Sequence, residues 1–464
     1  MENDLPIAAV RRLSMRVSVF MFLSLVGSAF GVTAAESQPA PTPPKVADPA
    51  NTIDSNGRRD VVAKLSEALR DDYVFPDVGE KAAEKINGAL AAGAYDTLSD
   101  PNAFAARLSS DVAAVAHDKH LSIHAEGGPR PGSASSPKAM PRAEAGVTRA
   151  DKLAGKVGYI EVIGFPPLAS AKPTFDRAMT ALKGSRALII DDRRNGGGSP
   201  DSVAYLISFL VPPNAPIEIN HILSREPKTN NFKRETFSSQ RTPVSFAKVP
   251  VYVLTSKDTF SGGEALAYDI QAHKLGKVVG EVTGGGANPT GPVDLGHAMV
   301  ASLPGARAEN PITKTNWEGR GVQPDHSVPA QDALKVALQD LGAKPATEID
   351  SASVKQVFAP RSNALPGTEA AARKFITGLA NGNPDYAGMT PEFANFNREH
   401  LPMLRQTLLL PLGELRSIEF ESAGAMGGDE YRASFANGAL IVAVLFDAER
   451  KVEGAMMHPA PAGQ

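Results

Sequence analysis

The sequence predicts a mixed α/β fold, with a helical region before the α/β core and a small α+β region after it. Apolar residues recur at helical spacing from Val61 to Val115, and strand-like runs alternate with helical runs between residues 156 and 341. Helical runs and then four strand-like runs follow residue 366. Such a succession indicates more than one packed layer, and 464 residues suffice for two or three domains.

The composition excludes several classes of protein. The chain contains no cysteine, so disulfides, thiol catalysis and cysteine-ligated metals are ruled out. Its formal net charge is −3 at pH 7 and the charges form no long blocks, so we expect no nucleic-acid partner.

The first residues have the order of a signal peptide. Arg11, Arg12 and Arg16 precede an apolar run over residues 17–32, and the small residues Ala34 and Ala35 offer a cleavage site. The alternative is a single membrane anchor, for which the run is short and rich in serine and glycine. We expect a periplasmic or secreted protein that keeps no membrane span after cleavage.

Shifts in composition and periodicity predict the domain boundaries. Proline-rich or Gly/Ser-rich stretches without periodicity separate the periodic ones. The expected order is a signal peptide (1–35), a Pro-rich linker (36–50), an N-terminal helical domain (51–126), a flexible connection (127–155), the α/β domain (156–341), a linker (342–365) and a C-terminal α+β domain (366–464).

Two stretches in the α/β region suggest a catalytic site. Val249–Leu254 predicts a buried strand, and a helix begins directly after Ser261, so the serine hydroxyl would lie among free N–H groups at a helix start. Ser261 is then either a nucleophile or the first residue of a capping box with Glu264. Asn195–Gly198 also follows a strand and is either a flexible turn, an oxyanion cradle or a phosphate loop. The phosphate loop is disfavoured because no Gly-Lys-Ser/Thr sequence follows.

Histidines and one carboxylate supply further candidates. His117 and His120 are three residues apart, but no third ligand of the His-Glu-x-x-His kind accompanies them. His120 is therefore an ordinary core or surface histidine, or a catalytic base with a distant partner. Trp317, the only tryptophan, precedes Glu318 on a glycine-flanked turn.

Four motifs together resemble the C-terminal-processing (tail-specific) serine peptidases. The resemblance is greatest to the branch with the tricorn protease core and interphotoreceptor retinoid-binding protein, over residues 59–341. It implies a ClpP/crotonase-like α/β core. The motifs cover residues 118–122, 191–198, 259–264 and 317–325.

The resemblance also implies roles for single residues. Tail-specific members use a Ser–Lys dyad whose lysine would fall near Gly286, where this sequence has none. In the tricorn-like branch the base maps to His120 and its partner to Glu318, although Lys119 replaces the serine before the histidine. The 35 residues between His120 and Lys156 leave no room for a PDZ domain.

We therefore predict a serine peptidase that acts on a peptide or protein substrate. Ser261 would be the nucleophile, His120 the base and Glu318 its partner, as in other Ser-His-acid sites. The N–H groups of Gly262 and of Gly197 or Gly198 would form the oxyanion hole. We expect neither a cofactor nor a metal.

Alternatives remain at this point. The same scaffold serves as a non-catalytic carrier of hydrophobic ligands or peptides in retinoid-binding relatives. Thioester chemistry of the crotonase type is a second alternative, although export disfavours coenzyme A. The C-terminal region resembles cystatin-like or nuclear-transport-factor-like α+β domains and shows no catalytic constellation.

Overall fold

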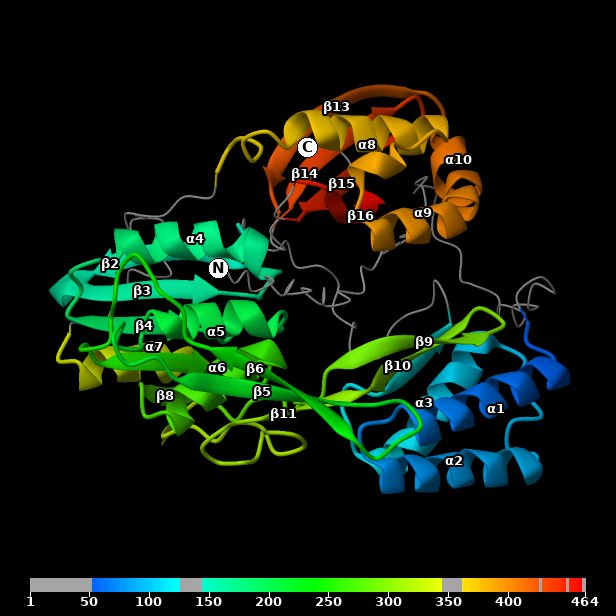
Figure 1. Ribbon diagram of the computed structural model, residues 1–464, viewed down its shortest axis with the longest axis horizontal. Coiled ribbons are helices and arrows are strands. Elements are labelled where there is room, and N and C mark those ends of the chain that lie inside the picture. Colours follow the sequence, from blue (N-terminus) through cyan, green and yellow to red (C-terminus); the bar gives the residue numbers. More distant parts are fainter. Residues whose placement is uncertain (1–51, 126–143, 344–360, 425–427, 448–449, 461–464) are drawn as a thin grey trace, which may run out of the picture.

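The computed structural model describes residues 52–125, 144–343, 361–424, 428–447 and 450–460. The expected signal peptide, the Pro-rich linker and much of both later connections lie outside these residues. Within them, no helix is long and apolar enough to cross a bilayer. The predicted mixed α/β architecture with a helical N-terminal region is confirmed (Figure 1).

The N-terminal region consists of three helices and a small sheet. The helices are α1 (Ser55–Asp71), α2 (Pro76–Ala91) and α3 (Pro101–Ala116). Asp54 caps α1 and Asp100 caps α3, each accepting a backbone N–H. The helices share one apolar core with a sheet of order β1-β10-β9, made of β1 (Ser122–Ala125), β9 (Thr290–Gly296) and β10 (Met299–Pro304). A hairpin from much later in the chain thus completes the helical region.

A six-stranded sheet forms the centre of the α/β region. Its order is β12-β8-β7-β4-β3-β2, with only β2 antiparallel to its neighbour. The strands are β2 (Val147–Leu153), β3 (Val157–Val162), β4 (Ala187–Asp191), β7 (Val251–Thr255), β8 (Lys277–Gly280) and β12 (His326–Ser327). The carboxyl ends of β4 and β7 meet at one edge, so the loops that follow them lie together.

Helices cover both faces of this sheet. One face packs against α4 (Leu168–Ala181), α5 (Pro200–Ser208) and α6 (Gly262–Ala272), and the other against α7 (Ala330–Asp340). Beside the first face lies a sheet of order β11-β5-β6, from β5 (Glu218–Arg225), β6 (Phe232–Ser238) and β11 (Ala306–Glu309). Figure 1 shows β5 and β11 extending from the core toward the helical region.

The C-terminal region is an α+β unit with its own apolar core. Its elements are α8 (Glu369–Asn381), α9 (Pro391–Leu404), a π-helical turn (Arg405–Leu409), α10 (Leu410–Leu412), and the meander β13 (Leu415–Ala423), β14 (Asp429–Phe435), β15 (Gly438–Phe446) and β16 (Val452–Pro459). Helix α9 begins eight residues before the predicted start at Glu399, because Thr390 caps it and Pro391 suits its first turn.

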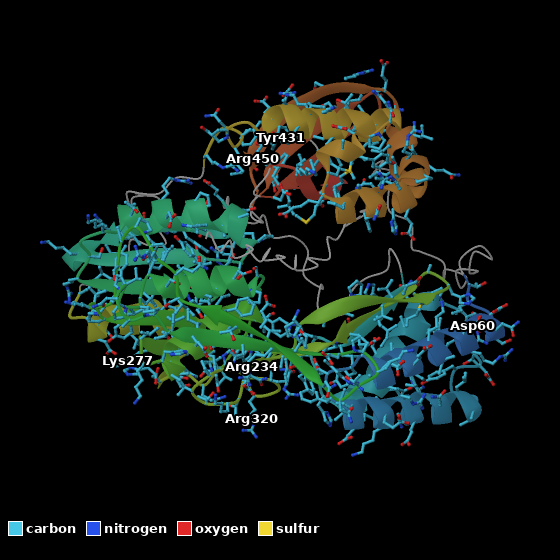
Figure 2. The ribbon with its side chains drawn as sticks, in the orientation of Figure 1. Asp60, Arg234, Lys277, Arg320, Tyr431 and Arg450 are labelled. Atoms are coloured by element: carbon cyan, nitrogen blue, oxygen red, sulfur yellow. The ribbon has the colours of Figure 1, made fainter. Side chains whose placement is uncertain are left out.

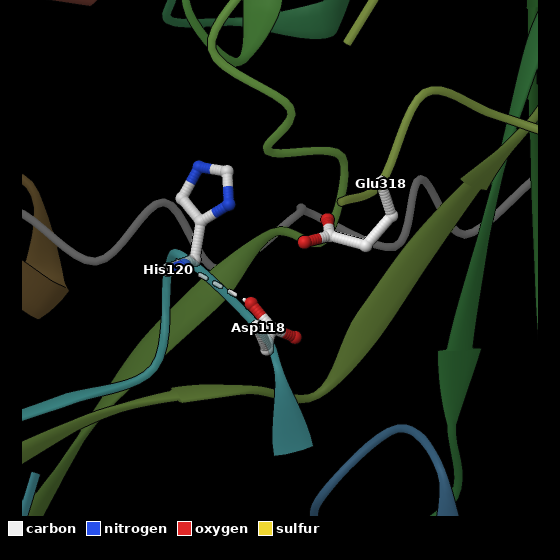
Figure 3. A group of neighbouring side chains, drawn as sticks. All are labelled: Asp118, His120 and Glu318. Atoms are coloured by element: carbon white, nitrogen blue, oxygen red, sulfur yellow. Dashed lines mark hydrogen bonds between the residues drawn. The ribbon is translucent and has the colours of Figure 1, made fainter. Parts of the chain in front are cut away.

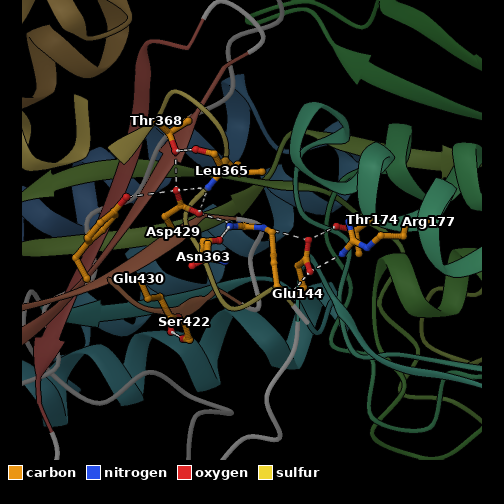
Figure 4. Close-up of polar contacts among 11 residues, drawn as sticks. Glu144, Thr174, Arg177, Asn363, Leu365, Thr368, Ser422, Asp429 and Glu430 are labelled. Carbon is orange, nitrogen blue, oxygen red and sulfur yellow. Dashed lines mark hydrogen bonds and ion pairs between the residues drawn. The ribbon is translucent and has the colours of Figure 1, made fainter. Parts of the chain in front are cut away.

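A network of ion pairs around two buried carboxylates joins the C-terminal unit to the α/β region (Figure 4). Glu144 accepts hydrogen bonds from Thr174, Arg177 and Arg361. Arg361 also pairs with Asp429 at 2.8 Å. Glu144 and Asp429 are both buried and have lost their hydration. The Arg361 guanidinium supplies each carboxylate with a compensating positive charge.

The outer surface carries the charged side chains. Figure 2 shows Asp60, Lys277 and Arg320 projecting from the ribbon, and all three are exposed. Tyr431, labelled in the same figure, is buried in the C-terminal core.

Candidate active site

Ser261 lies at the junction between β7 and α6, as the sequence predicts. It is the residue before the first turn of α6 and has φ 53° and ψ −117°. A non-glycine residue with positive φ is strained by about 1–3 kcal/mol, and such strain persists only where neighbours enforce it. The start of α6 directs its free N–H groups toward this serine.

Glu264 enforces the conformation of this turn. Its buried carboxylate accepts hydrogen bonds from the N–H of Ser261 at 2.9 Å, from Thr283 Oγ1 and Gly285 N at 2.5 Å, and from Gly286 N at 2.8 Å. Burial raises the pKa of Glu264, while these hydrogen bonds act in the opposite direction. The capping contact predicted for Glu264 is therefore one part of a larger brace.

Gly197 and Gly198, the second and third of the three glycines after Asn195, pack directly against the serine turn. A side chain at Gly197 would place its Cβ 2.7 Å from the Cβ of Ser261, and one at Gly262 would lie 2.9 Å from Gly198 N. Gly197 and Gly198 have φ of 103° and 135°, which also favour glycine. Only glycine at these positions lets the backbone of residues 197–198 approach the backbone of residues 261–262 so closely.

These two glycines differ in one respect. The Gly197 N–H donates to Asn195 Oδ1 at 2.8 Å. The N–H groups of Gly198 and Gly262 have no hydrogen-bond acceptor within the described part of the chain. Two free donors therefore flank Ser261, and the Gly197 N–H is already engaged.

His120 is held near the serine turn by the segment that follows α3. Asp118 is buried and accepts hydrogen bonds from the N–H of His120 at 3.0 Å, from Tyr73 Oη at 3.2 Å and from Asn288 Nδ2 at 2.8 Å. The imidazole packs against Phe260, the residue before Ser261, with 4.7 Å between ring centroids. The structure thus brings His120 beside the serine turn from a distant part of the sequence.

Glu318 lies next to the His120 ring (Figure 3). His120, Glu318 and Asp118 each offer a nitrogen or carboxylate oxygen within 4.8 Å of the others. Glu318 Oε2 accepts the N–H of Ala287, whereas Glu318 Oε1 and His120 Nδ1 are buried without a hydrogen-bond partner among the described residues. These two atoms are complementary, because neutral imidazole can donate a hydrogen bond from Nδ1 and a carboxylate oxygen accepts one.

Burial shifts both groups toward their neutral forms. It lowers the pKa of His120 from 6.5, an effect that Asp118 partly opposes. It raises the pKa of Glu318 to about 7, and the Ala287 N–H partly opposes this rise. At neutral pH the His120 base is therefore mainly neutral, and both the protonated and the ionised forms of Glu318 are populated.

The same three side chains could in principle hold a metal ion, and His117 is not among them. The carboxylate of Asp118 already accepts three hydrogen bonds. Such saturation suits a residue that orients its neighbours better than it suits a ligand that must turn toward a cation. The spacing of His117 and His120 suggested that these two histidines could share a metal. The structure instead groups His120 with Asp118 and Glu318.

Lys119 and Trp317 both brace the glycine run 284–286. The ammonium group of Lys119 is exposed and donates to the carbonyl of Gly284. Trp317 Nε1 donates to the carbonyl of Gly286 at 2.7 Å, and Asn316 Oδ1 accepts the N–H of Glu318. The turn with Glu318 and the loop opposite Ser261 are therefore one connected unit.

Sequence comparison identifies the family. Residues 156–328 match the profile described as peptidase family S41, and residues 55–151 match the N-terminal domain of peptidase S41 in eukaryotic IRBP. The two matches span more than half of the chain. The chain belongs to peptidase family S41.

Several solved structures resemble this member of the S41 family. A protein from Parabacteroides merdae described as a peptidase is 18% identical, with a TM-score of 0.49 over 61% of this chain and 96% of that one. The photosystem II D1 C-terminal processing protease is 21% identical, with a TM-score of 0.33 over 46% of this chain and 55% of that one. The tricorn protease is 21% identical, with a TM-score of 0.26 over 41% of this chain and 17% of that one.

Sequence reasoning missed two residues of the candidate site. Asp118 was noted only as part of a motif, and Glu264 only as a helix cap. The signal for Asp118 was its place two residues before His120, from which a carboxylate can bind the backbone N–H. No local signal reports the three bonds from Glu264 to residues 283–286, because they link distant segments.

Proposed function

We propose that this S41 protein is an exported serine-type peptidase, related to the tail-specific proteases, that cleaves peptide bonds through an acyl-enzyme on Ser261. One observation carries the proposal most. Beside the serine turn, His120 and Glu318 each offer a ligand atom within 4.8 Å of the other, and each buries an atom, Nδ1 or Oε1, without a partner among the described residues. Leaving such atoms unpaired costs about 1–3 kcal/mol each, which a catalytic pair recovers when it closes.

In the acylation step, His120 accepts the hydroxyl proton of Ser261 while Oγ attacks the substrate carbonyl carbon. The C–N bond then breaks, and His120 returns the proton to the leaving amine. A water molecule repeats the sequence and releases the new carboxyl terminus. Glu318 accepts a hydrogen bond from His120 Nδ1, which fixes the tautomer and stabilises the imidazolium.

The N–H groups of Gly198 and Gly262 would hold the oxyanion that forms on the carbonyl oxygen. Both lie beside Ser261 and are free of acceptors in the described residues, whereas the Gly197 N–H serves Asn195. Each donor to an oxyanion contributes on the order of 3 kcal/mol in the transition state. Gly198 is therefore preferred over Gly197 for this role.

The proposal includes the finer architecture. The parallel sheet with helices on both faces supports a crotonase-like core, and the helices with a four-stranded meander support a cystatin-like C-terminal domain. The domain boundaries at residues 51–126, 156–341 and 366–464 are proposed with it, except that β2 (Val147–Leu153), which pairs with β3, joins the α/β domain. Export rests on the basic, apolar and small-residue order of residues 1–35. N-terminal sequencing of the exported protein should find a start at Ala35 or Glu36, and an intact Met1 would contradict it.

A carrier of hydrophobic ligands or peptides is the second candidate, because an apolar cavity borders Ser261. A fluorophosphonate probe separates the two functions. The peptidase proposal expects covalent labelling of Ser261, located by mass spectrometry of the digested protein, and no labelling of the Ser261→Ala variant. Tight lipid binding without labelling would instead support the carrier.

A further inference from the structure

The cavity that borders Ser261 has a volume of about 110 Å³. Its walls are mostly apolar and come from α5, β5, β11 and the turn with the tryptophan. They include Val203, Ala204, Ile219, Ile222, Ala308 and Trp317. For scale, an apolar cavity of about 150 Å³ holds a benzene molecule. This cavity therefore suits a slender aliphatic chain better than a large aromatic ring.

One face of α6 runs along the cavity. Ser261, Ala265 and Asp269 all line it, and their spacing of four residues places them on the same side of the helix. A rise of 1.5 Å per residue puts Asp269 about 12 Å along the helix axis from Ser261. The cavity thus connects the serine with a buried carboxylate.

At the Asp269 end of the cavity, one of the buried acceptor atoms, Asn220 Oδ1, lacks a donor among the described residues. Asp269 is fully buried and accepts hydrogen bonds from Asn220 Nδ2 at 2.7 Å and Asn310 Nδ2 at 2.8 Å. Asn310 Oδ1 is occupied by the N–H groups of Ile312 and Thr313. Asn220, also buried and lining the cavity, has an Oδ1 with no partner among the described residues.

Burial raises the pKa of Asp269 to about 7, although the two asparagines act in the opposite direction. Near neutral pH both the protonated and the ionised forms of this carboxyl group are therefore populated. A cation placed beside it would favour the ionised form.

We propose that this cavity takes the side chain of the residue whose carbonyl carbon is attacked, and that it selects lysine. The inference rests on the peptidase function proposed above. A lysine side chain brings an apolar four-carbon stem for the walls and three donors without an acceptor for Asp269 and Asn220. In serine peptidases, a carboxylate in the corresponding pocket selects basic side chains in the same way.

The closest competitors fit less well for identifiable reasons. Norleucine has nearly the same shape as lysine but brings no donor for Asn220 Oδ1 or Asp269. A glutamate would add only acceptors when ionised. An indole would exceed the space.

Two fluorogenic peptides that differ only in lysine or norleucine before the scissile bond test this. At about pH 8, kcat/KM for the lysine peptide should exceed that for norleucine by about tenfold or more, the effect of hydrogen bonds to a charged group. The ratio should fall as the pH drops through about 7, because Asp269 takes up a proton. Titration of His120 and Glu318 affects both substrates alike and cancels in the ratio.

The Asp269→Asn variant should bring the ratio close to one and remove its pH dependence. Asp201→Asn is the matched control, since Asp201 is a carboxylate on the neighbouring α5 that does not line the cavity; it should keep the ratio. If Asp269→Asn does not fold, the pH dependence in the unaltered protein decides. Equal cleavage of both peptides, or a ratio independent of pH, overturns the inference.

The failure of this inference differs from failure of the proposed function. A protein that labels with fluorophosphonate at Ser261 but prefers norleucine is a peptidase without the lysine pocket. In the Ser261→Ala variant, calorimetric binding of the two peptides tests the pocket without chemistry. Tighter binding of the lysine peptide supports the inference, and equal binding contradicts it.

Discussion

The two halves of the candidate site are held in different ways. The serine turn is fully braced, because Glu264 accepts four hydrogen bonds and the glycines at 197 and 198 pack against it. The pair of His120 and Glu318 is positioned by its surroundings, but the two groups are not bonded to each other, and each has a buried atom without a partner. Catalytic hydrogen bonds often tighten only when substrate binds. The difference suggests a rigid nucleophile and a base that completes its contacts during the reaction.

The largest effect should come from removing a reacting group. His120→Ala should reduce kcat/KM about as much as Ser261→Ala, by roughly 100- to 10,000-fold, because a unit of nucleophile and base fails together. Steady-state kinetics on a peptide ester measure this.

Lys119→Ala is the matched control. Lys119 is adjacent to His120 in sequence, but its ammonium group binds the carbonyl of Gly284. Because Lys119 supports this loop but touches no reacting group in the proposed mechanism, Lys119→Ala should keep far more turnover than His120→Ala. Loss of turnover in Lys119→Ala with a tolerated His120→Ala would assign the base to a lysine instead.

The braced half is tested at Gly198. A side chain there would place its Cβ 2.0 Å from the carbonyl oxygen of Phe165, so Gly198→Ala must displace the backbone that carries one oxyanion donor. We expect kcat to fall by about 100- to 1,000-fold. Gly196→Ala is the control, because no atom lies within 4 Å of its added Cβ. Equal activity in both variants would remove Gly198 from the oxyanion hole.

The unbonded half is tested by pH. The reaction needs neutral His120 and ionised Glu318, and burial raises the pKa of Glu318 to about 7. Activity should therefore rise with pH through about 7. Glu318→Gln should lower the plateau less than His120→Ala and move the acid limb to lower pH, since only His120 remains and burial lowers its pKa below 6.5. An acid limb that stays in place would show that Glu318 does not control it.

The smallest effect should follow removal of the C-terminal unit, which lines neither half of the site in the described residues. A chain that ends at Ala343 should keep its turnover of a small ester, measured beside its melting temperature. It loses the contacts of Arg361 with Glu144, which keeps Thr174 and Arg177 as partners. A folded truncation without activity would mean that this unit contributes to the site.

The sequence by itself determined most elements and the identity of the candidate residues. Local periodicity marks α1 to α3, β3, β4 and the C-terminal meander, because each buries one regular face. It did not mark β2, which was expected within a flexible connection. That strand carries Arg149, Asp151 and Lys152, and it is recognisable only from its pairing with β3.

Only the tertiary structure decided how the candidate residues meet. His120, Ser261 and Glu318 come from three distant segments, and their order in the chain does not give their separation in space. The Glu264 brace, the engaged N–H of Gly197 and the buried Asp269 are likewise invisible in sequence. The physical reason is that hydrogen bonding and burial depend on which segments the fold packs together, whereas periodicity reports only which face of each segment is apolar.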